Sequence, residues 1–294
     1  MITFKQYLNE SRTKAISVQE LMKWADANAS SYLKGSHFLY RGAAHSGPEL
    51  AIGDSTTSSP RASANTNNNY TLWMDNHPAF KGWPKRSQSW IATDDVHTAS
   101  GFGNILIMIV ADNAKIGLVK HDDLWHVPIA GKMQINTWND IMEEVLEVFK
   151  KNNNKTYDAL REGLAYVTAS RLEEHILKMD DNDDMSAIEK IILDEMEQVY
   201  HLMVDENCDN LYELWDKLFA PSLFEKTTGA EISSSPAMGE VWIEGVCGFV
   251  PNSGNGMSEE DKMVMHQWAM KKYPKFAEYL VRGWEDHDEL EEYE

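Results

Sequence analysis

The sequence Gly239-Glu-Val-Trp-Ile-Glu-Gly245 runs directly into Val246-Cys-Gly-Phe-Val-Pro251, and this stretch decides the fold that we expect for the chain. Large β-forming residues fill it, and apolar residues stand at alternate positions 241, 243, 247 and 249. A period of two is typical of a strand that buries one face. We therefore predict a strand here, with Glu240 at its mouth, directly after the turn-prone run of residues 233–239.

Glu240 has two interpretations at this stage. A carboxylate fixed at a strand edge beside a loop of serine, glycine and proline can hold a charge against a substrate. An edge glutamate can equally be a solvated surface residue. The choice between them depends on two other stretches of the chain.

Composition limits the class of protein. The 294 residues are 43% hydrophobic and 10% aromatic, which is enough to build one large domain or two ordinary ones. A formal charge of −20 makes nucleic acid an unlikely partner, although it does not exclude one, and argues against binding to an anionic membrane. Cys208 and Cys247 form no CxxC pair, which fits a reducing cytoplasm. We find no apolar run long enough to span a membrane and no signal-peptide core.

The first residues, Met1-Ile-Thr-Phe-Lys-Gln-Tyr-Leu-Asn-Glu10, form a short amphipathic segment. From its residues alone, this segment predicts a single helical turn with frayed ends. Leu8-Asn9-Glu10 also resembles the Leu-x-Glu signal that the prohead proteases of large tailed bacteriophages cut. This resemblance implies that residues 1–16 are a leader segment that is processed.

The segment His37-Phe-Leu-Tyr-Arg-Gly42 predicts a strand that ends in an arginine. A guanidinium after three apolar residues must be paired in a salt bridge or must face a ligand cleft, and the sequence leaves both open. Before this strand, Ser17 is a plausible N-cap for a helix that reaches Leu33. After it, residues 44–71 are rich in Ser, Thr, Asn, Gly and Pro, and we expect a long, poorly ordered surface loop.

A second polar segment, residues 84–93, precedes a buried strand. Ser87 and Ser89 alternate and would point the same way from a strand that Trp90 continues. Asp94 or Asp95 could then cap a short helix that reaches Phe102. The apolar run 104–110 predicts a strand buried on both faces.

Helical patterns fill most of the remaining chain. Between residues 138 and 219, stripes at helical spacing predict an insertion of three or four helices, one of which would bury Ile188. Residues 258–294 predict a helix capped by Ser258, a second short helix through Leu280 and an acidic tail. His121 and His126 flank two aspartates, but loop histidines without further ligands do not predict a metal site.

Three of these stretches together resemble the Arg, Ser and Glu motifs of the mono-ADP-ribosyltransferases. They are Arg41 in Phe-Leu-Tyr-Arg-Gly, Ser87-Gln-Ser89 before a short helix and a hydrophobic strand, and Glu240 heading the Glu-Val-Trp-Ile-Glu-Gly strand. Their order and the types of element agree with the family, which includes toxins of the binary-toxin group and transferases carried by tailed phages. The resemblance implies an α+β fold of split, mixed or antiparallel sheets with flanking helices, here over residues 17–257.

The resemblance also implies a site. NAD would be bound as substrate, with Glu240 stabilising positive charge on the ribose and Arg41, followed by Gly42, at the phosphates. Ser89, with Ser87 beside it, would support the nicotinamide pocket, and Trp90 or Phe102 would stack on the nicotinamide or belong to the core. No metal ion is implied.

The implied reaction is transfer of ADP-ribose to a macromolecular acceptor, most plausibly a host protein, in the host cytoplasm or from a phage head. An NAD glycohydrolase, and a noncatalytic phage head or interaction protein with a degenerate transferase fold, remain alternatives. Arginine-modifying members carry Glu two residues before the catalytic glutamate and asparagine-modifying ones often carry Gln, whereas this chain has Met238. The acceptor residue type therefore stays open.

Overall fold

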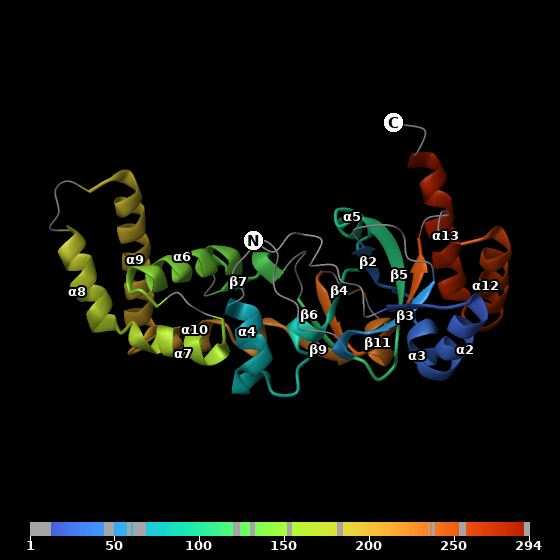
Figure 1. Ribbon diagram of the computed structural model, residues 1–294, viewed down its shortest axis with the longest axis horizontal. Coiled ribbons are helices and arrows are strands. Elements are labelled where there is room, and N and C mark those ends of the chain that lie inside the picture. Colours follow the sequence, from blue (N-terminus) through green and yellow to red (C-terminus); the bar gives the residue numbers. More distant parts are fainter. Residues whose placement is uncertain are drawn as a thin grey trace. The chain divides into compact units, whose positions relative to one another are not determined.

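A computed structural model describes the chain except for residues 1–12, 44–49, 58–59, 61–68, 120–123, 130–132, 152–154, 181–184, 235, 237–238, 253–256 and 291–294. The chain divides into two compact units (Figure 1). Unit 1 comprises residues 1–64, 82–124 and 224–294, and unit 2 comprises residues 65–81 and 125–223. Each unit is described by itself below.

Unit 1 is built on two antiparallel sheets. The five-stranded sheet has the order β1-β3-β11-β5-β2, and the four-stranded sheet has the order β4-β10-β6-β9. The strands are β1 (Thr13–Ala15), β2 (Tyr40–Ala43), β3 (Ala51–Asp54), β4 (Trp90–Ala92), β5 (Asn104–Val110), β6 (Lys115–Leu118), β9 (Glu225–Thr228), β10 (Val241–Glu244) and β11 (Val246–Pro251). The α+β class predicted from the sequence is confirmed.

The stretch 239–251 contributes to both sheets, because it is two strands and not the single strand that we predicted. Gly245 separates β10 from β11 with a φ of +145°, a backbone conformation that side chains with a Cβ rarely adopt. β10 then pairs with β4 and β6, whereas β11 pairs with β3 and β5. One glycine therefore passes the chain from one sheet to the other.

Helices cover the sheets of unit 1. They are α2 (Val18–Asn28), α3 (Ser30–Leu33), α5 (Val96–Ser100), α11 (Gly229–Ile232), α12 (Glu259–Lys272) and α13 (Pro274–Leu290). α12 packs against α2 and α13, so the two ends of the chain's described part share one core (Figure 1). Asp26 of α2 fixes this packing, since it accepts hydrogen bonds from Trp268, Lys272 and Tyr273.

Several local predictions are confirmed and others are wrong. Ser17 and Ser258 are N-caps, and the buried strand at 104–110 is present as β5. The helix predicted from Ser17 to Leu33 is broken at Ala29, which has a non-helical conformation. The second C-terminal helix runs on to Leu290, well beyond Leu280.

The loop predicted for residues 44–71 is also partly wrong. It contains β3, which pairs with β1 and β11, and the start of α4 (Asn69–Asn76). β3 has only four residues, and its partner strands lie far away in the sequence, so no local sequence pattern predicts it.

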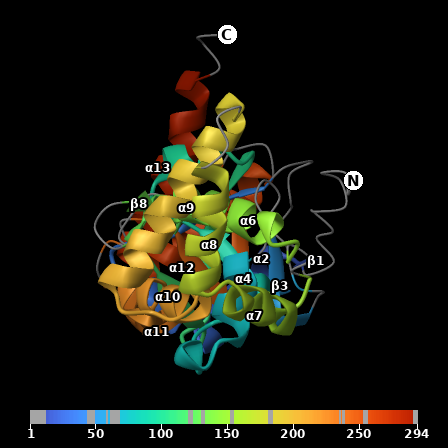
Figure 2. The same cartoon turned by 90° about the vertical axis from the view of Figure 1, so that its left-hand side faces the viewer.

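Unit 2 is mainly helical. Its elements are α4, α6 (Ile135–Val148), α7 (Tyr157–Tyr166), α8 (Ala169–Asp180), α9 (Ala187–Asp205) and α10 (Leu211–Leu218), with a short hairpin of β7 (Pro128–Ile129) and β8 (Met133–Gln134). The described part of residues 138–219 thus holds five helices, and not three or four. α8 and α9 lie side by side in both views (Figure 2). Ile188 is 71% exposed, which corrects its predicted burial.

No helix in the described ranges is long and apolar enough to cross a membrane. The predicted processing signal at residues 8–10 and Met238 lie outside the described residues. So do His121 and the aspartates beside it, whereas His126 is exposed at the end of the short 3-10 helix Leu124–His126.

Candidate active site

The three motif segments lie on neighbouring strands of unit 1. In the four-stranded sheet, β4 pairs with β10 so that Trp90 is opposite Ile243 and Ala92 is opposite Val241. The end of β4 also reaches β2, since Tyr40 and Thr93 exchange backbone hydrogen bonds of 2.7 and 3.0 Å. β4 therefore stands between the strand that carries Arg41 and the strand that follows Glu240.

Glu240 is bound by an arginine that the sequence did not single out. Its Oε1 accepts a hydrogen bond of 2.8 Å from Nη2 of Arg86, and the two side chains are only 9% and 12% exposed. The backbone N–H of Leu124 lies 3.5 Å from Oε2. A buried carboxylate needs such a partner to remain ionised, and the geometry fixes where its negative charge lies. Glu240 is thus not the solvated edge residue of the alternative interpretation.

A second set of contacts holds the segment that carries Arg86. Glu240, Trp242 and Glu244 occupy alternate positions and so share one face of β10. Trp242 Nε1 donates to the carbonyl of Pro84, and the backbone N–H of Lys85 donates to Glu244 Oε2 at 2.7 Å. Residues 84–86 therefore cross this face of β10 as a strap that these two hydrogen bonds hold in place. Trp83 adds to the strap, because its ring stacks on that of Trp242.

The strap explains a wrong prediction about β10. Alternation predicted that one face of the strand would be buried, but Val241, Trp242 and Ile243 are all fully buried. Val241 and Ile243 belong to the core of unit 1, while Trp242 lies beneath Trp83 and Phe224. Glu240 lies on the same face of β10 as Trp242, and it forms its ion pair with Arg86 on that face.

Ser87 and Ser89 do not alternate along a strand, which corrects the second motif. Ser87 lies in the 3-10 helix η3 (Arg86–Gln88), and Ser89 is its C-cap. The Ser89 hydroxyl is fully buried and donates to the carbonyl of Lys85 at 2.8 Å. This hydrogen bond closes the turn that presents Arg86 to Glu240, so Ser89 supports the site through the backbone.

Arg41 contacts β4 directly. Its Nη1 donates to the carbonyl of Ile91 at 2.7 Å, and its guanidinium lies over the ring of Trp90 at 5.5 Å from the centroid. The side chain is half-buried. A guanidinium is planar and always charged, which is the property that phosphate recognition uses.

Of the two aromatic candidates, only Phe102 has an accessible ring. Trp90 is 4% exposed, packs edge-on against Phe249 and donates to the carbonyl of Gly245. Phe102, just after α5, is 66% exposed. A Cβ at Gly42 would come within 2.2 Å of the Ala99 carbonyl and 2.6 Å of the Phe102 Cβ. Gly42 thus lets α5 and Phe102 approach the strand of Arg41 closely.

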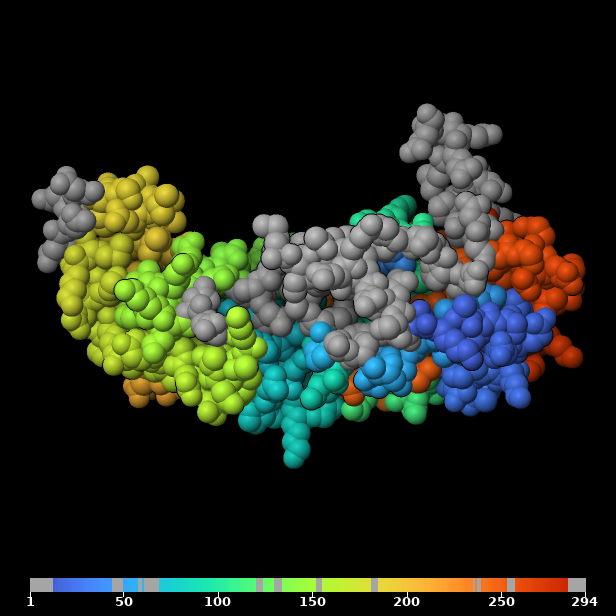
Figure 3. All heavy atoms as spheres, in the orientation of Figure 1, coloured from blue at the N-terminus to red at the C-terminus, as the bar shows by residue number. Residues whose placement is uncertain are grey.

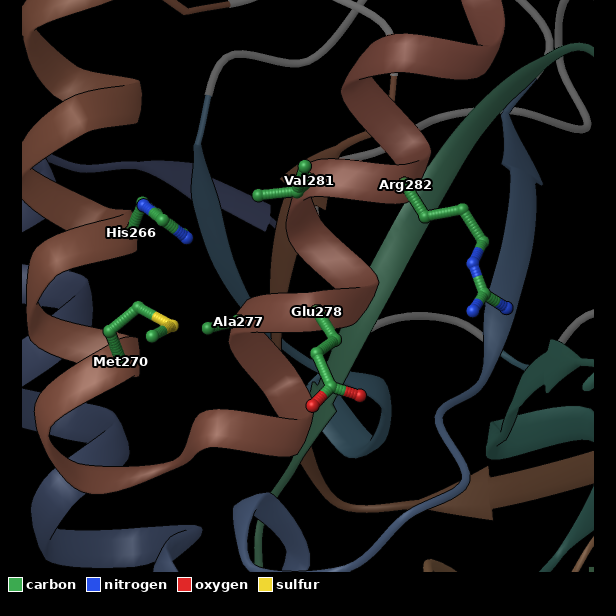
Figure 4. Close-up of a pocket in the computed structure, with 6 residues that line it drawn as sticks. All are labelled: His266, Met270, Ala277, Glu278, Val281 and Arg282. Carbon is green, nitrogen blue, oxygen red and sulfur yellow. The ribbon is translucent and has the colours of Figure 1, made fainter.

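Unit 1 has a pocket that none of the motif residues lines. This pocket, of about 370 Å³, lies between α12 and α13 (Figure 4). Within the described part of the chain, no group of three His, Cys, Asp or Glu side chains could hold a metal ion. The motif segments thus supply a carboxylate in a buried ion pair, two guanidinium groups and an exposed aromatic ring.

None of the protein-family models, curated proteins and solved structures compared with this chain matches it. The resemblance to a transferase family therefore stands on three short motifs and on their placement in unit 1. Sequence reasoning missed Arg86, although the run Pro84-Lys-Arg-Ser offered a signal: a basic residue directly before the serine motif, in an acidic chain.

Proposed function

We propose that this protein breaks the bond between nicotinamide and ribose in NAD and transfers ADP-ribose to a macromolecular acceptor. The observation that carries the proposal is the ion pair of Glu240 and Arg86 beside β4, the strand that also contacts Arg41. Three segments from distant parts of the sequence thus bring a carboxylate and two guanidinium groups to adjoining strands. The acceptor that we propose is a host protein.

The chemistry requires a carboxylate of fixed position. When the C–N bond breaks, nicotinamide takes the electron pair of that bond and leaves as a neutral molecule, while positive charge develops on the ribose. A preorganised negative charge lowers the energy of that state more than it lowers the energy of bound NAD. The acceptor's nucleophilic atom then bonds to the same ribose carbon and loses its proton. We assign the stabilising charge to Glu240 and its orientation to Arg86.

The other motif residues would bind the dinucleotide. Arg41 would contact its phosphates, a role that suits a planar, always-charged guanidinium. Phe102 would stack on the nicotinamide, since its ring is exposed beside β2. Ser89 would act through the η3 turn, because its hydroxyl is buried.

The arrangement of elements also supports a transferase-like fold. Unit 1 has two antiparallel sheets, and the Arg, Ser and Glu motifs stand at β2, before β4 and before β10, in the order that the family shares. We propose that unit 1 is an ADP-ribosyltransferase-like domain and that the helices of unit 2 are an insertion in it. A location in the host cytoplasm, with delivery in a phage head, would follow from this function.

A noncatalytic protein with the same plan is the second candidate. It is favoured by the partners that Arg41, Ser89 and Glu240 already have within the chain. A side chain that the fold itself satisfies can be structural alone. The experiment below separates the two candidates.

Incubation of the protein with NAD labelled in the adenylate part, in a bacterial lysate, tests the proposal. Label on macromolecules supports the transferase. Release of nicotinamide with no labelled macromolecule indicates a glycohydrolase, in which water takes the acceptor's place. Absence of both, at a protein concentration where folding is verified by circular dichroism, overturns the proposal in favour of the noncatalytic candidate.

A further inference from the structure

Glu244 ends β10, and its carboxylate joins two other segments of unit 1 to that strand. Its Oε1 accepts a hydrogen bond of 2.7 Å from Nζ of Lys115, which lies opposite on the neighbouring strand β6. Its Oε2 accepts a hydrogen bond of 2.7 Å from the backbone N–H of Lys85. The side chain of Glu244 is 14% exposed, whereas that of Lys115 is 57% exposed. Glu244 is thus a mostly buried carboxylate with a different donor on each oxygen.

The backbone N–H that Glu244 binds is one residue away from the arginine that pairs with Glu240. Lys85 is the N-cap of η3, and Arg86 is the first residue of that turn. Consecutive Cα atoms are about 3.8 Å apart across a trans peptide bond, so a shift of the Lys85 backbone also shifts the Arg86 backbone. Arg86 in turn holds Oε1 of Glu240 at 2.8 Å. Glu244 therefore fixes one end of a short series of contacts that ends at the Glu240 carboxylate.

The hydrogen bond from Lys85 to Glu244 is a firm anchor for the strap. Its acceptor is an ionised carboxylate, and hydrogen bonds to charged acceptors are shorter and stronger than neutral ones. The hydrogen bond that Trp242 Nε1 donates to the carbonyl of Pro84 is longer, at 3.3 Å. Of these two hydrogen bonds between β10 and the strap backbone, the one to Glu244 is thus the shorter and the charged one.

We propose that Glu244 is a positioning residue for the carboxylate that acts on NAD. Glu244 sets where the Arg86 guanidinium stands, and Arg86 sets where the charge of Glu240 lies. The link to NAD rests on the proposed function. A preorganised charge stabilises the transition state only where positive charge develops, and a misplacement of about 1 Å can lower a rate about a hundredfold. Loss of Glu244 should therefore slow the cleavage of the bond and leave the binding of NAD unchanged.

Glu244→Val tests this role, because it removes the acceptor and keeps a residue that favours a strand. We expect kcat for nicotinamide release to fall about tenfold or more, while KM for NAD changes less than about twofold. Glu244→Gln should keep most of the wild-type kcat, since its amide oxygen can still accept from Lys85. A merely structural Glu244 would change the free energy of unfolding and leave kcat of the folded variant unchanged. Circular dichroism at the assay temperature verifies folding.

Lys85→Pro removes the other half of the same hydrogen bond. The φ of Lys85 is −76°, which is close to the φ of about −65° that proline requires, and the lysine side chain is exposed. The substitution therefore deletes the N–H and retains the backbone conformation. It should lower kcat as Glu244→Val does, and the double variant should lose no more than either single variant. Losses in kcat that multiply would overturn the proposal, because they would show that Glu244 acts through another contact.

A second readout does not depend on catalysis. The coupling between Arg86 and Glu240 is measured by urea unfolding in a cycle of Arg86→Met and Glu240→Gln. Repeated with Glu244→Val present, the same cycle should give less than about half of that coupling. Met263→Gln is the control, since Met263 is 55% exposed on α12, whose surface is visible in orange-red in Figure 3. It should leave both the coupling and kcat unchanged.

The two readouts separate failure of this inference from failure of the proposed function. If the wild-type protein releases nicotinamide and Glu244→Val has the same kcat, the positioning role is wrong and the proposed function stands. If the wild-type protein releases no nicotinamide, the proposed function is wrong, and the coupling alone decides whether Glu244 positions the ion pair. A coupling that Glu244→Val leaves unchanged overturns the inference in either case.

Discussion

The guanidinium of Arg86 lies 2.8 Å from the carboxylate of Glu240, and both side chains are almost entirely buried. These residues are 154 positions apart in the sequence, and the pair forms because residues 84–86 cross one face of β10. The pair determines where a negative charge stands beside β4. Substitutions in this pair can be tested for their effect on the free energy of unfolding and, separately, for their effect on the proposed nicotinamide release.

Removing Arg86 should cost stability because it leaves the charge of Glu240 buried without its guanidinium. We expect Arg86→Met to lower the free energy of unfolding by about 3 kcal/mol, as for other broken buried ion pairs. In the double variant Arg86→Met with Glu240→Gln, most of that loss should be regained, because no charge remains to be compensated. Urea unfolding of the four proteins in this cycle measures the coupling. Additive losses would show that the two groups do not interact.

Phe102 should affect NAD without affecting the fold. Its ring is exposed, so Phe102→Ala should change the free energy of unfolding by less than about 0.5 kcal/mol. If the ring stacks on nicotinamide, the same substitution should raise KM for NAD about fivefold, and Phe102→Tyr should preserve it. Steady-state kinetics of nicotinamide release gives KM for each variant. An unchanged KM for Phe102→Ala would exclude the ring from the binding site.

Gly245 should be intolerant of any side chain. Its φ is +145°, its N–H donates to Ser55, and its carbonyl accepts from Trp90. A Cβ there would also meet Ala114 at 3.1 Å. We expect Gly245→Ala to cost about 3 kcal/mol of stability, since the strained backbone cannot relax without breaking these contacts.

Gly82 provides the matched comparison. It also has a positive φ, of +82°, but a Cβ there would meet nothing within 4 Å. Gly82→Ala should therefore cost only about 1 kcal/mol, which is the backbone cost alone. Equal losses for the two variants in thermal or urea unfolding would contradict the role of Gly245 in joining the sheets.

Unit 2 should become less stable as pH rises from about 4.5 to about 7. Burial, a hydrogen bond with Glu144 and the charges of Glu144 and Asp140 raise the pKa of Glu195 from 4.5 to about 7. The folded chain therefore keeps a proton that the unfolded chain has lost, and the stabilisation that this proton brings disappears as pH rises through 7.

Glu195→Gln should remove this pH dependence, because the amide stays neutral throughout. Asp194→Asn is the control, since Asp194 is exposed on the same helix and should leave the profile unchanged. Melting temperatures at pH 5, 6, 7 and 8 measure both variants. A wild-type profile that does not fall between pH 5 and 8 would contradict the raised pKa.

Local patterns in the sequence predicted much of the fold. Ser17 and Ser258 are followed three residues later by acidic residues, so both caps are visible in a short window. The run 104–110 is apolar at every position after Asn104, which is typical of a strand buried on both faces.

What the sequence could not predict depends on contacts between distant residues. Gly245 lies inside an apolar run, and nothing near it says that β10 and β11 belong to different sheets. Trp242 was expected to lie on the less buried face, but Trp83 and Phe224 cover it. The sequence did not indicate Arg86, because its partner Glu240 is 154 positions away and the two side chains meet only where the strap of residues 84–86 crosses β10.

The central claim is that Glu240, held by Arg86, promotes cleavage of NAD. Nicotinamide release from NAD by the purified protein, compared with that by Glu240→Gln, tests it most directly. We predict that the wild-type protein releases nicotinamide and that Glu240→Gln lowers kcat by about a hundred- to a thousandfold while the fold is retained, as for loss of a preorganised electrostatic group. Equal rates for the two proteins, or no release by the wild type, would contradict the claim.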